Sequence, residues 1–206
     1  MRARQEPKAL LAVVLIAVAF SGVGPRLYGT WLLEATPVAV GCVILVVTYS
    51  RFQFTPLVYR ALAFGALWIA LGAHYSYADA LPGEWLQAWL RLDRNSYDRI
   101  GHVAQGALSA LVIRELLLRV SRSRRGWWLT IVVTSASLGT SAGFELIEAF
   151  AASVTGRVGT VYLGTQGDPL DAEWDMLRAL AGAVLSQLLL RQAHDRQIET
   201  TTAAAV

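Results

Sequence analysis

The chain has 206 residues, of which 55% are hydrophobic and 16% are charged, and its mean hydropathy is +0.45. Soluble domains carry about 25% charged residues and disordered chains are polar, so this composition excludes both classes. The net charge of +3 is small and scattered, which argues against nucleic acid as a partner. A single cysteine excludes a disulfide framework and a Cys-based zinc site. The composition therefore indicates a membrane protein.

Six apolar stretches are candidates for membrane-spanning helices, which need about 20 mostly apolar residues. They lie at residues 9–24, 28–50, 57–77, 99–120, 126–153 and 174–191. The first stretch also contains Ala17-Val18-Ala19, which resembles the cleavage site of a signal peptide, but the later stretches would still need a membrane. We expect residues 1–206 to form one all-α, polytopic membrane bundle of about six transmembrane helices, with a disordered tail at 192–206.

The basic residues predict how the bundle is oriented, because Arg and Lys concentrate on the cytoplasmic side of membrane proteins. An N-terminus inside the cell places 11 basic residues on that side and five on the other, with Arg114 and Arg178 inside spans. The longest connection, 78–98, carries Trp85 and Trp89, which suit the outer interface. We therefore predict a multi-pass inner-membrane protein, surrounded by lipid, with both termini cytoplasmic.

The acidic residues show the opposite bias, because 11 of 15 fall at or beyond the outer ends of spans. The rule for basic residues does not require this, since Asp and Glu contribute little to orientation. An ionisable group inside a span costs about 2.5–3.5 kcal/mol and usually faces a cavity or a partner. Some of these acids are therefore expected to form a site at the outer face.

Three helix ends supply the candidate residues. They are Asp98 and His102 in the fourth span, Glu145 and Glu148 in the fifth, and Asp171 and Asp175 at the start of the sixth. Each pair is spaced by three or four residues, so its members share a helix face. His74 ends the third span on the same side.

Neighbouring carboxylates repel one another unless a cation, an arginine or a shared proton compensates. Carboxylates together with histidine suit a divalent metal such as zinc or manganese, and carboxylates alone suit magnesium. We expect His102, Glu145 and Asp175 to be metal ligands. Asp98 would orient His102, and Glu148 or Asp171 would act as the general base.

Each of these residues also has a simpler interpretation. Asp98 and Asp171 could cap helices, His102 could bond across the bundle, Glu145 could pair with Arg178, and Glu148 could be solvated. At the inner end, Arg114 and Glu115 are explained by snorkelling and a salt bridge.

The same segments resemble the YjdF-like family of bacterial inner-membrane proteins. The resemblance lies in His74-Tyr75-Ser76-Tyr77, in the segment from Tyr97 to Gly106, in Glu145-Leu146-Ile147-Glu148, and in Leu163 to Asp168 running on to Trp174-Asp175-Met176. It implies a membrane protein and supplies no reaction.

A weaker similarity is to VanZ-like membrane proteins, which are associated with glycopeptide resistance. Their Asp-Lys-x-x-His pattern corresponds to Asp98–His102, their following Glu to Glu145, and their Asp-x-x-x-Asn to Asp171–Asp175. Asp175 stands where that family has Asn, and Glu148 lies near its usual Gln, so the site here is more acidic. The resemblance implies a polar site at the outer ends of these helices.

Three classes of function fit this pattern. The first is a metal-assisted hydrolase or transferase that acts on a lipid-linked or envelope substrate, because the candidate site lies at the level of lipid head groups. The second is a proton- or cation-coupled transporter, although no inverted repeat is visible and the inner half offers only Arg114 and Glu115 as a path. The third is a non-catalytic partner in envelope assembly.

Overall fold

The computed structural model describes residues 2–156, 158, 161–162 and 165–203, and every element in them is helical. The elements are α1 (Arg2–Ser21), α2 (Tyr28–Thr48), α3 (Pro56–Tyr75), the 3-10 turn η1 (Tyr77–Asp79), α4 (Leu81–Leu90), α5 (Tyr97–Arg119), α6 (Trp127–Thr155), α8 (Asp171–Leu189) and α9 (Arg191–Ala203). The prediction of an all-α membrane bundle is confirmed. Leu163 and Gly164, part of the sequence motif noted above, lie outside the described residues.

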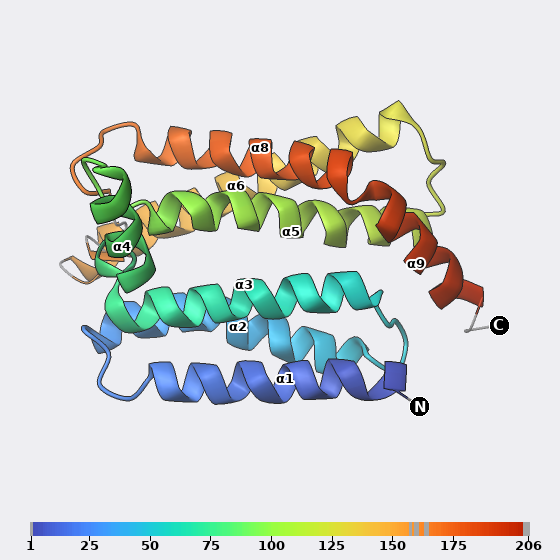
Figure 1. The fold of residues 1–206 in the computed structure, drawn as a ribbon, viewed down its shortest axis with the longest axis horizontal. Coiled ribbons are helices and arrows are strands. Elements are labelled where there is room, and N and C mark those ends of the chain that lie inside the picture. The colour runs from blue at the N-terminus through green and yellow to red at the C-terminus, as the bar shows by residue number, and fades with distance from the viewer. Residues whose placement is uncertain (1, 157, 159–160, 163–164, 204–206) are drawn as a thin grey trace.

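The long helices form two groups that lie side by side (Figure 1). α1 and α2 pack on α3 in one group, α5, α6 and α8 pack together in the other, and α3 contacts α5 between them. The short α4 lies at one end of the bundle, while α1 begins and α9 ends at the opposite end (Figure 1). This shared end is what an even number of membrane crossings requires; the side of the membrane that it faces stays a prediction.

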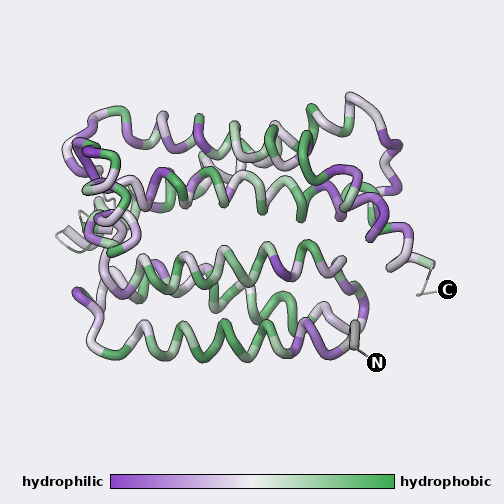
Figure 2. Tube along the Cα trace, in the orientation of Figure 1, coloured by the Kyte–Doolittle hydropathy of each residue, from purple (hydrophilic) through white to green (hydrophobic). Residues whose placement is uncertain are grey.

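Four helices, α2, α3, α5 and α6, are long and apolar enough to cross a membrane. α1 and α8 run alongside them (Figure 1), but charged residues shorten their apolar parts: Glu6 and Lys8 in α1, and Asp175 and Arg178 in α8. Hydrophobic residues follow the middle of the helices and hydrophilic ones gather at both ends (Figure 2). The crossing of the membrane by α1 and α8 stays a prediction.

Large apolar side chains point outward, as expected when the surrounding medium is hydrocarbon. The exposed ones include Ile16, Phe20, Val43, Val47, Phe150 and Leu188. The buried positions are dominated by small residues such as Ala63, Ala110, Ala183, Ser109 and Ser137. Small residues let helix backbones approach closely, which is how helices associate when the lipid is as apolar as the side chains.

The closest approach joins α5 to α8. A Cβ added to Gly106 would lie 1.8 Å from the carbonyl oxygen of Ala179, and one added to Gly182 would lie 2.0 Å from that of Val103. Only glycine fits at these two crossing points. Their contact brings together the ends of α5 and α8 that carry the candidate residues. This end of the bundle, where α4 lies, is predicted to face outward and is called the outer end; the opposite end is called the inner end.

The described part of the tail predicted to be disordered, residues 192–203, is helical in the structure. α9 covers residues 191–203, and its side chains His194 and Ile198 are buried. The polar composition suggested disorder because the contacts that order this helix come from distant parts of the chain. At the other end, Trp85 and Trp89 on α4 are exposed, and their placement at the outer interface stays a prediction.

Candidate functional site

Asp98, His102 and Asp175 meet at the outer end of the bundle. Each offers one ligand atom, and the three atoms lie within 4.8 Å of one another. His102 Nε2 is 3.4 Å from Asp98 Oδ1 on its own helix and 3.9 Å from Asp175 Oδ2 on α8. The side chain of Asp175 is only 3% exposed, so these carboxylates are held largely away from bulk water.

Glu145 lies on the other side of the same imidazole ring. Its Oε1 atom is 3.8 Å from His102 Nδ1, and both atoms are buried without a hydrogen-bond partner. Glu145 therefore faces the ring nitrogen opposite to the one that meets Asp98 and Asp175. The structure brings together four of the six residues that the sequence singled out, with an acidic group on each side of the imidazole.

Glu148 lines a cavity that also reaches Asp98 and His102. Among the acidic residues that line the described part of this cavity, one was not predicted as part of the site: Glu34 of α2, which is 5% exposed and has a buried carboxylate oxygen without a partner. Its position in an otherwise uncharged span was visible in the sequence, but nothing there placed α2 next to α5 and α6.

Asp171 belongs to a different contact. Its carboxylate accepts a hydrogen bond of 2.9 Å from Arg94, and Arg94 and Arg99 each lie 3.5 Å from Asp168. These ion pairs join the segment that leads into α5, and the first turn of α5, to the start of α8 and the segment before it. Asp171 is thus engaged by an arginine, whereas Glu148 has no ion pair within the described part of the chain.

The structure also bears on the simpler interpretations of these residues as helix caps or ion-pair partners. Neither α5 nor α8 has a side-chain cap, so Asp98 and Asp171 do not cap these helices. Arg178 donates to Asp175 at 2.9 Å and is paired with that residue rather than with Glu145. His74 lies apart from the site, since its Nδ1 atom is 3.0 Å from the carbonyl oxygen of Ser21.

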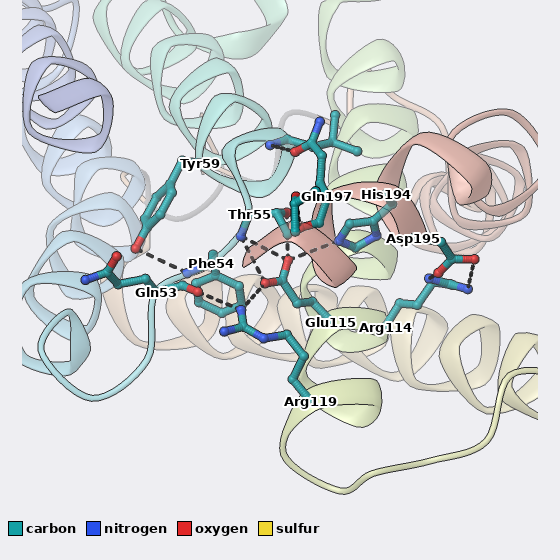
Figure 3. A network of polar contacts seen from close by, with 12 residues as sticks. Gln53, Phe54, Thr55, Tyr59, Arg114, Glu115, Arg119, His194, Asp195 and Gln197 are labelled. Carbon is teal, nitrogen blue, oxygen red and sulfur yellow. Dashed lines mark hydrogen bonds and ion pairs between the residues drawn. The ribbon is translucent and has the colours of Figure 1, made fainter. Parts of the chain in front are cut away.

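A second polar network, at the inner end, is centred on the buried side chains of Glu115 and His194 and was not predicted as such (Figure 3). Glu115, which is 0% exposed, accepts hydrogen bonds from the backbone N–H and the hydroxyl of Thr55 at 2.9 and 2.8 Å. It also contacts Arg119 and lies 3.0 Å from His194 Nε2 on α9. The carboxylate of Glu115 has hydrogen-bond partners in three segments of the chain. We therefore interpret this network as structural, because it holds these segments together.

Comparison with known proteins agrees with the sequence motifs and the helical architecture. A family described as "Predicted membrane protein (DUF2238)" matches residues 7–196. The chain is 38% identical to the protein named "Inner membrane protein YjdF" of Escherichia coli (strain K12) over 188 residues, 91% of this chain and 90% of that protein. No solved structure matches the chain with significance.

The family match runs from within α1 to within α9 and includes the residues of the candidate site. The two matches confirm the YjdF-like resemblance and the prediction of an inner-membrane protein, and apolar helices long enough to cross a membrane agree with both. The chain belongs to the DUF2238 family of predicted membrane proteins.

Proposed function

We propose that this protein is a metal-assisted hydrolase or transferase that acts on a lipid-linked or envelope substrate at the outer face of the inner membrane. The observation that carries the proposal is the meeting of Asp98, His102 and Asp175, whose ligand atoms lie within 4.8 Å of one another. An imidazole with two carboxylates suits zinc or manganese, and carboxylates also suit magnesium.

The geometry suggests how the roles are divided. Nε2 of His102 faces Asp98 and Asp175, so these three residues would hold the metal. Glu145, which faces Nδ1, would then fix the orientation of the ring, as carboxylates behind metal-bound histidines commonly do. This exchanges the roles that the sequence suggested for Asp98 and Glu145.

A metal at this site would polarise a phosphoryl or carbonyl oxygen and acidify a water molecule. Glu148 is the better placed of the two candidate bases, because it lines the cavity with Asp98 and His102 while Asp171 is paired with Arg94. The cavity continues from these residues into the apolar interior, which supports a lipid-linked substrate.

Transport is the less favoured alternative. The cavity extends toward the inner end of the bundle, where Lys8 and Tyr49 line it. Between its two ends it is lined by apolar side chains such as Val14, Val38 and Leu45. Polar side chains such as Ser109 and Thr140 are few in the described lining, so it suits a hydrocarbon chain better than an ion.

Metal analysis of the full-length protein in mild detergent tests the proposal. After incubation with zinc, manganese or magnesium and removal of free metal, we expect one bound ion per chain in the wild type and loss of it in Asp175→Asn. Glu173→Gln, an exposed acid two positions away on α8, is the matched control and should retain the metal. A metal-free wild type, or Asp175→Asn with full metal content, would overturn the metal-assisted mechanism.

Activity is tested on the same samples with bacterial lipid extract as substrate. We expect release of a head group or of phosphate that requires the added metal and is lost in Asp175→Asn. Metal-independent proton flux in reconstituted vesicles, abolished by the same variant, would instead favour transport.

A further inference from the structure

A cavity of about 510 Å³ lies between the two helix groups. α1, α2 and α3 line one side of it, and α5 and α6 line the other. Cavities of this size that are mostly apolar and carry a few convergent polar groups are typical of small-molecule sites. The polar groups here gather at the outer end, beside His102 and Asp98.

Four buried polar atoms of residues that line the cavity lack a hydrogen-bond partner. One is the Nδ1 of His102, which faces Glu145, and the others are the Oε2 of Glu34, the Oε1 of Gln105 and the Nε1 of Trp68. Buried polar groups are nearly always satisfied, so such atoms at one cavity point to a missing ligand. Glu34 and Gln105 offer acceptors, and the Trp68 indole offers an N–H donor. The ligand must therefore carry both donors and acceptors.

The charge at this end is negative. Glu34, Asp98 and Glu148 line it together with a single basic side chain, His102. The described lining contains no Arg, and Lys8 lies at the opposite end. Glu34 has no ion pair among the described residues. A carboxyl group buried in this way is neutral unless a cationic donor pairs with it, so its charged form requires such a donor. A head group with an ammonium group meets this requirement, whereas a purely anionic head group does not.

We propose that the cavity binds one molecule of a zwitterionic aminophospholipid such as phosphatidylethanolamine. Its ammonium group pairs with Glu34, a phosphate or ester oxygen accepts from Trp68 Nε1, and an acyl chain fills the apolar part beside Val14, Val38 and Leu45. The inference deepens the proposed function, on which its role as substrate rests, by naming the class of lipid. Binding itself does not depend on a metal.

A substitution at Gly41 of α2 can block the apolar part of the cavity, where the acyl chain would lie. Gly41 lines the cavity, and a Cβ added there meets nothing within 4 Å, so Gly41→Leu projects into the cavity without displacing the backbone. Gly139 of α6 is equally open but is exposed and lies outside the cavity lining. Gly139→Leu is therefore the matched control for the same change on another helix.

Native mass spectrometry of the full-length protein, with defined lipids added to the detergent, measures occupancy. We expect wild type and Gly139→Leu to bind one phosphatidylethanolamine, and Gly41→Leu to bind it at least about tenfold more weakly. If Gly41→Leu binds the lipid as wild type does while remaining folded by circular dichroism, the acyl chain does not occupy this cavity and the proposal is overturned.

The head group is tested by comparing lipids with the same acyl chains. Phosphatidylethanolamine should bind about tenfold more tightly than phosphatidylglycerol, which lacks the amine, and Glu34→Gln should remove most of this preference. Glu84→Gln, an exposed acid on α4, should retain it. Equal binding of the two lipids by wild type, or an undiminished preference in Glu34→Gln, would overturn the assignment of the head group.

The metal content of the same samples separates this inference from the proposed function. A protein that holds no metal but shows the lipid preference and its loss in Gly41→Leu would refute the metal mechanism and support the lipid site. A protein that holds its metal but shows neither effect would refute the lipid site alone.

Discussion

His102 on α5 and Asp175 on α8 approach to 3.9 Å across a helix crossing that two glycines make possible. Gly106 lies one turn below His102, and Gly182 lies two turns below Asp175. At both positions the backbone of one helix occupies the space that a side chain on the other would need. The packing of small residues thus sets the distance between two ionisable groups at this end of the bundle.

Gly106→Ala should therefore disturb both stability and the site. The added Cβ would lie 1.8 Å from the Ala179 carbonyl oxygen, and relieving this overlap must move α5 from α8. We expect destabilisation of about 1–3 kcal/mol or more, together with reduced metal content. Unfolding in detergent of increasing denaturing strength measures the loss of stability. Elemental analysis measures the metal content.

Gly139→Ala is the control for this substitution, because a Cβ there meets nothing within 4 Å. Alanine favours the helix over glycine by about 1 kcal/mol, so this variant should be neutral or slightly more stable. Equal behaviour of the two alanine variants would show that the α5–α8 crossing does not depend on glycine.

Glu145→Gln should weaken the metal site without removing it. If Glu145 orients His102 through Nδ1, its loss lowers metal affinity by about 10–100-fold, as for other carboxylates behind a metal-bound histidine. Asp175→Asn, which removes a ligand, should have the larger effect. Titration with zinc or manganese, followed by elemental analysis, compares the metal affinity of the two variants. A greater loss of affinity in Glu145→Gln than in Asp175→Asn would indicate that Glu145 is itself a ligand.

Glu115→Ala should destabilise the inner end of the bundle. The substitution leaves the Thr55 N–H, Arg119 and His194 without their shared acceptor (Figure 3). Breaking a buried charge network by removing one member costs about 3–5 kcal/mol, and proteolysis of α9 should become faster. Unfolding and limited proteolysis in detergent measure these effects.

Glu199→Ala provides the exposed counterpart on α9. Glu199 is 64% exposed and pairs with Arg125 at 3.1 Å, so its removal should change stability by less than about 1 kcal/mol. A similar loss in both variants would mean that the buried network adds nothing beyond a surface ion pair.

The contact of α9 with α5 should weaken in acid. Burial raises the pKa of Asp195, but hydrogen bonds and the positive charges of Arg114 and Arg125 lower it more, so the net pKa lies below its ordinary value of 3.8. A carboxyl group with a depressed folded-state pKa stabilises the fold above its unfolded pKa, and this contribution is lost as the pH falls through the folded pKa.

The melting temperature of wild type should therefore exceed that of Asp195→Asn above about pH 4, and the gap should narrow below it. Melting curves in detergent between about pH 6 and pH 3 measure the gap. A gap that stays constant or widens toward low pH would contradict the assigned role of the Arg114 and Arg125 charges.

The sequence by itself determined the features that depend on local pattern. Hydropathy identified a helical membrane protein, because each span must satisfy its own backbone and present an apolar surface. Helical spacing placed Asp98 with His102 on one face, and the excess of acids at the outer ends of spans indicated where a site would lie.

Only the tertiary structure decided which distant residues meet. Asp171 pairs with Arg94, 77 positions away, and Glu115 lies against His194, 79 positions away in a tail that looked disordered. Glu34 joins the cavity because α2 faces α5 and α6. The rotation and spacing of helices arise from close packing at small residues such as Gly106. The periodicity within a single helix does not indicate which other helices pack against it.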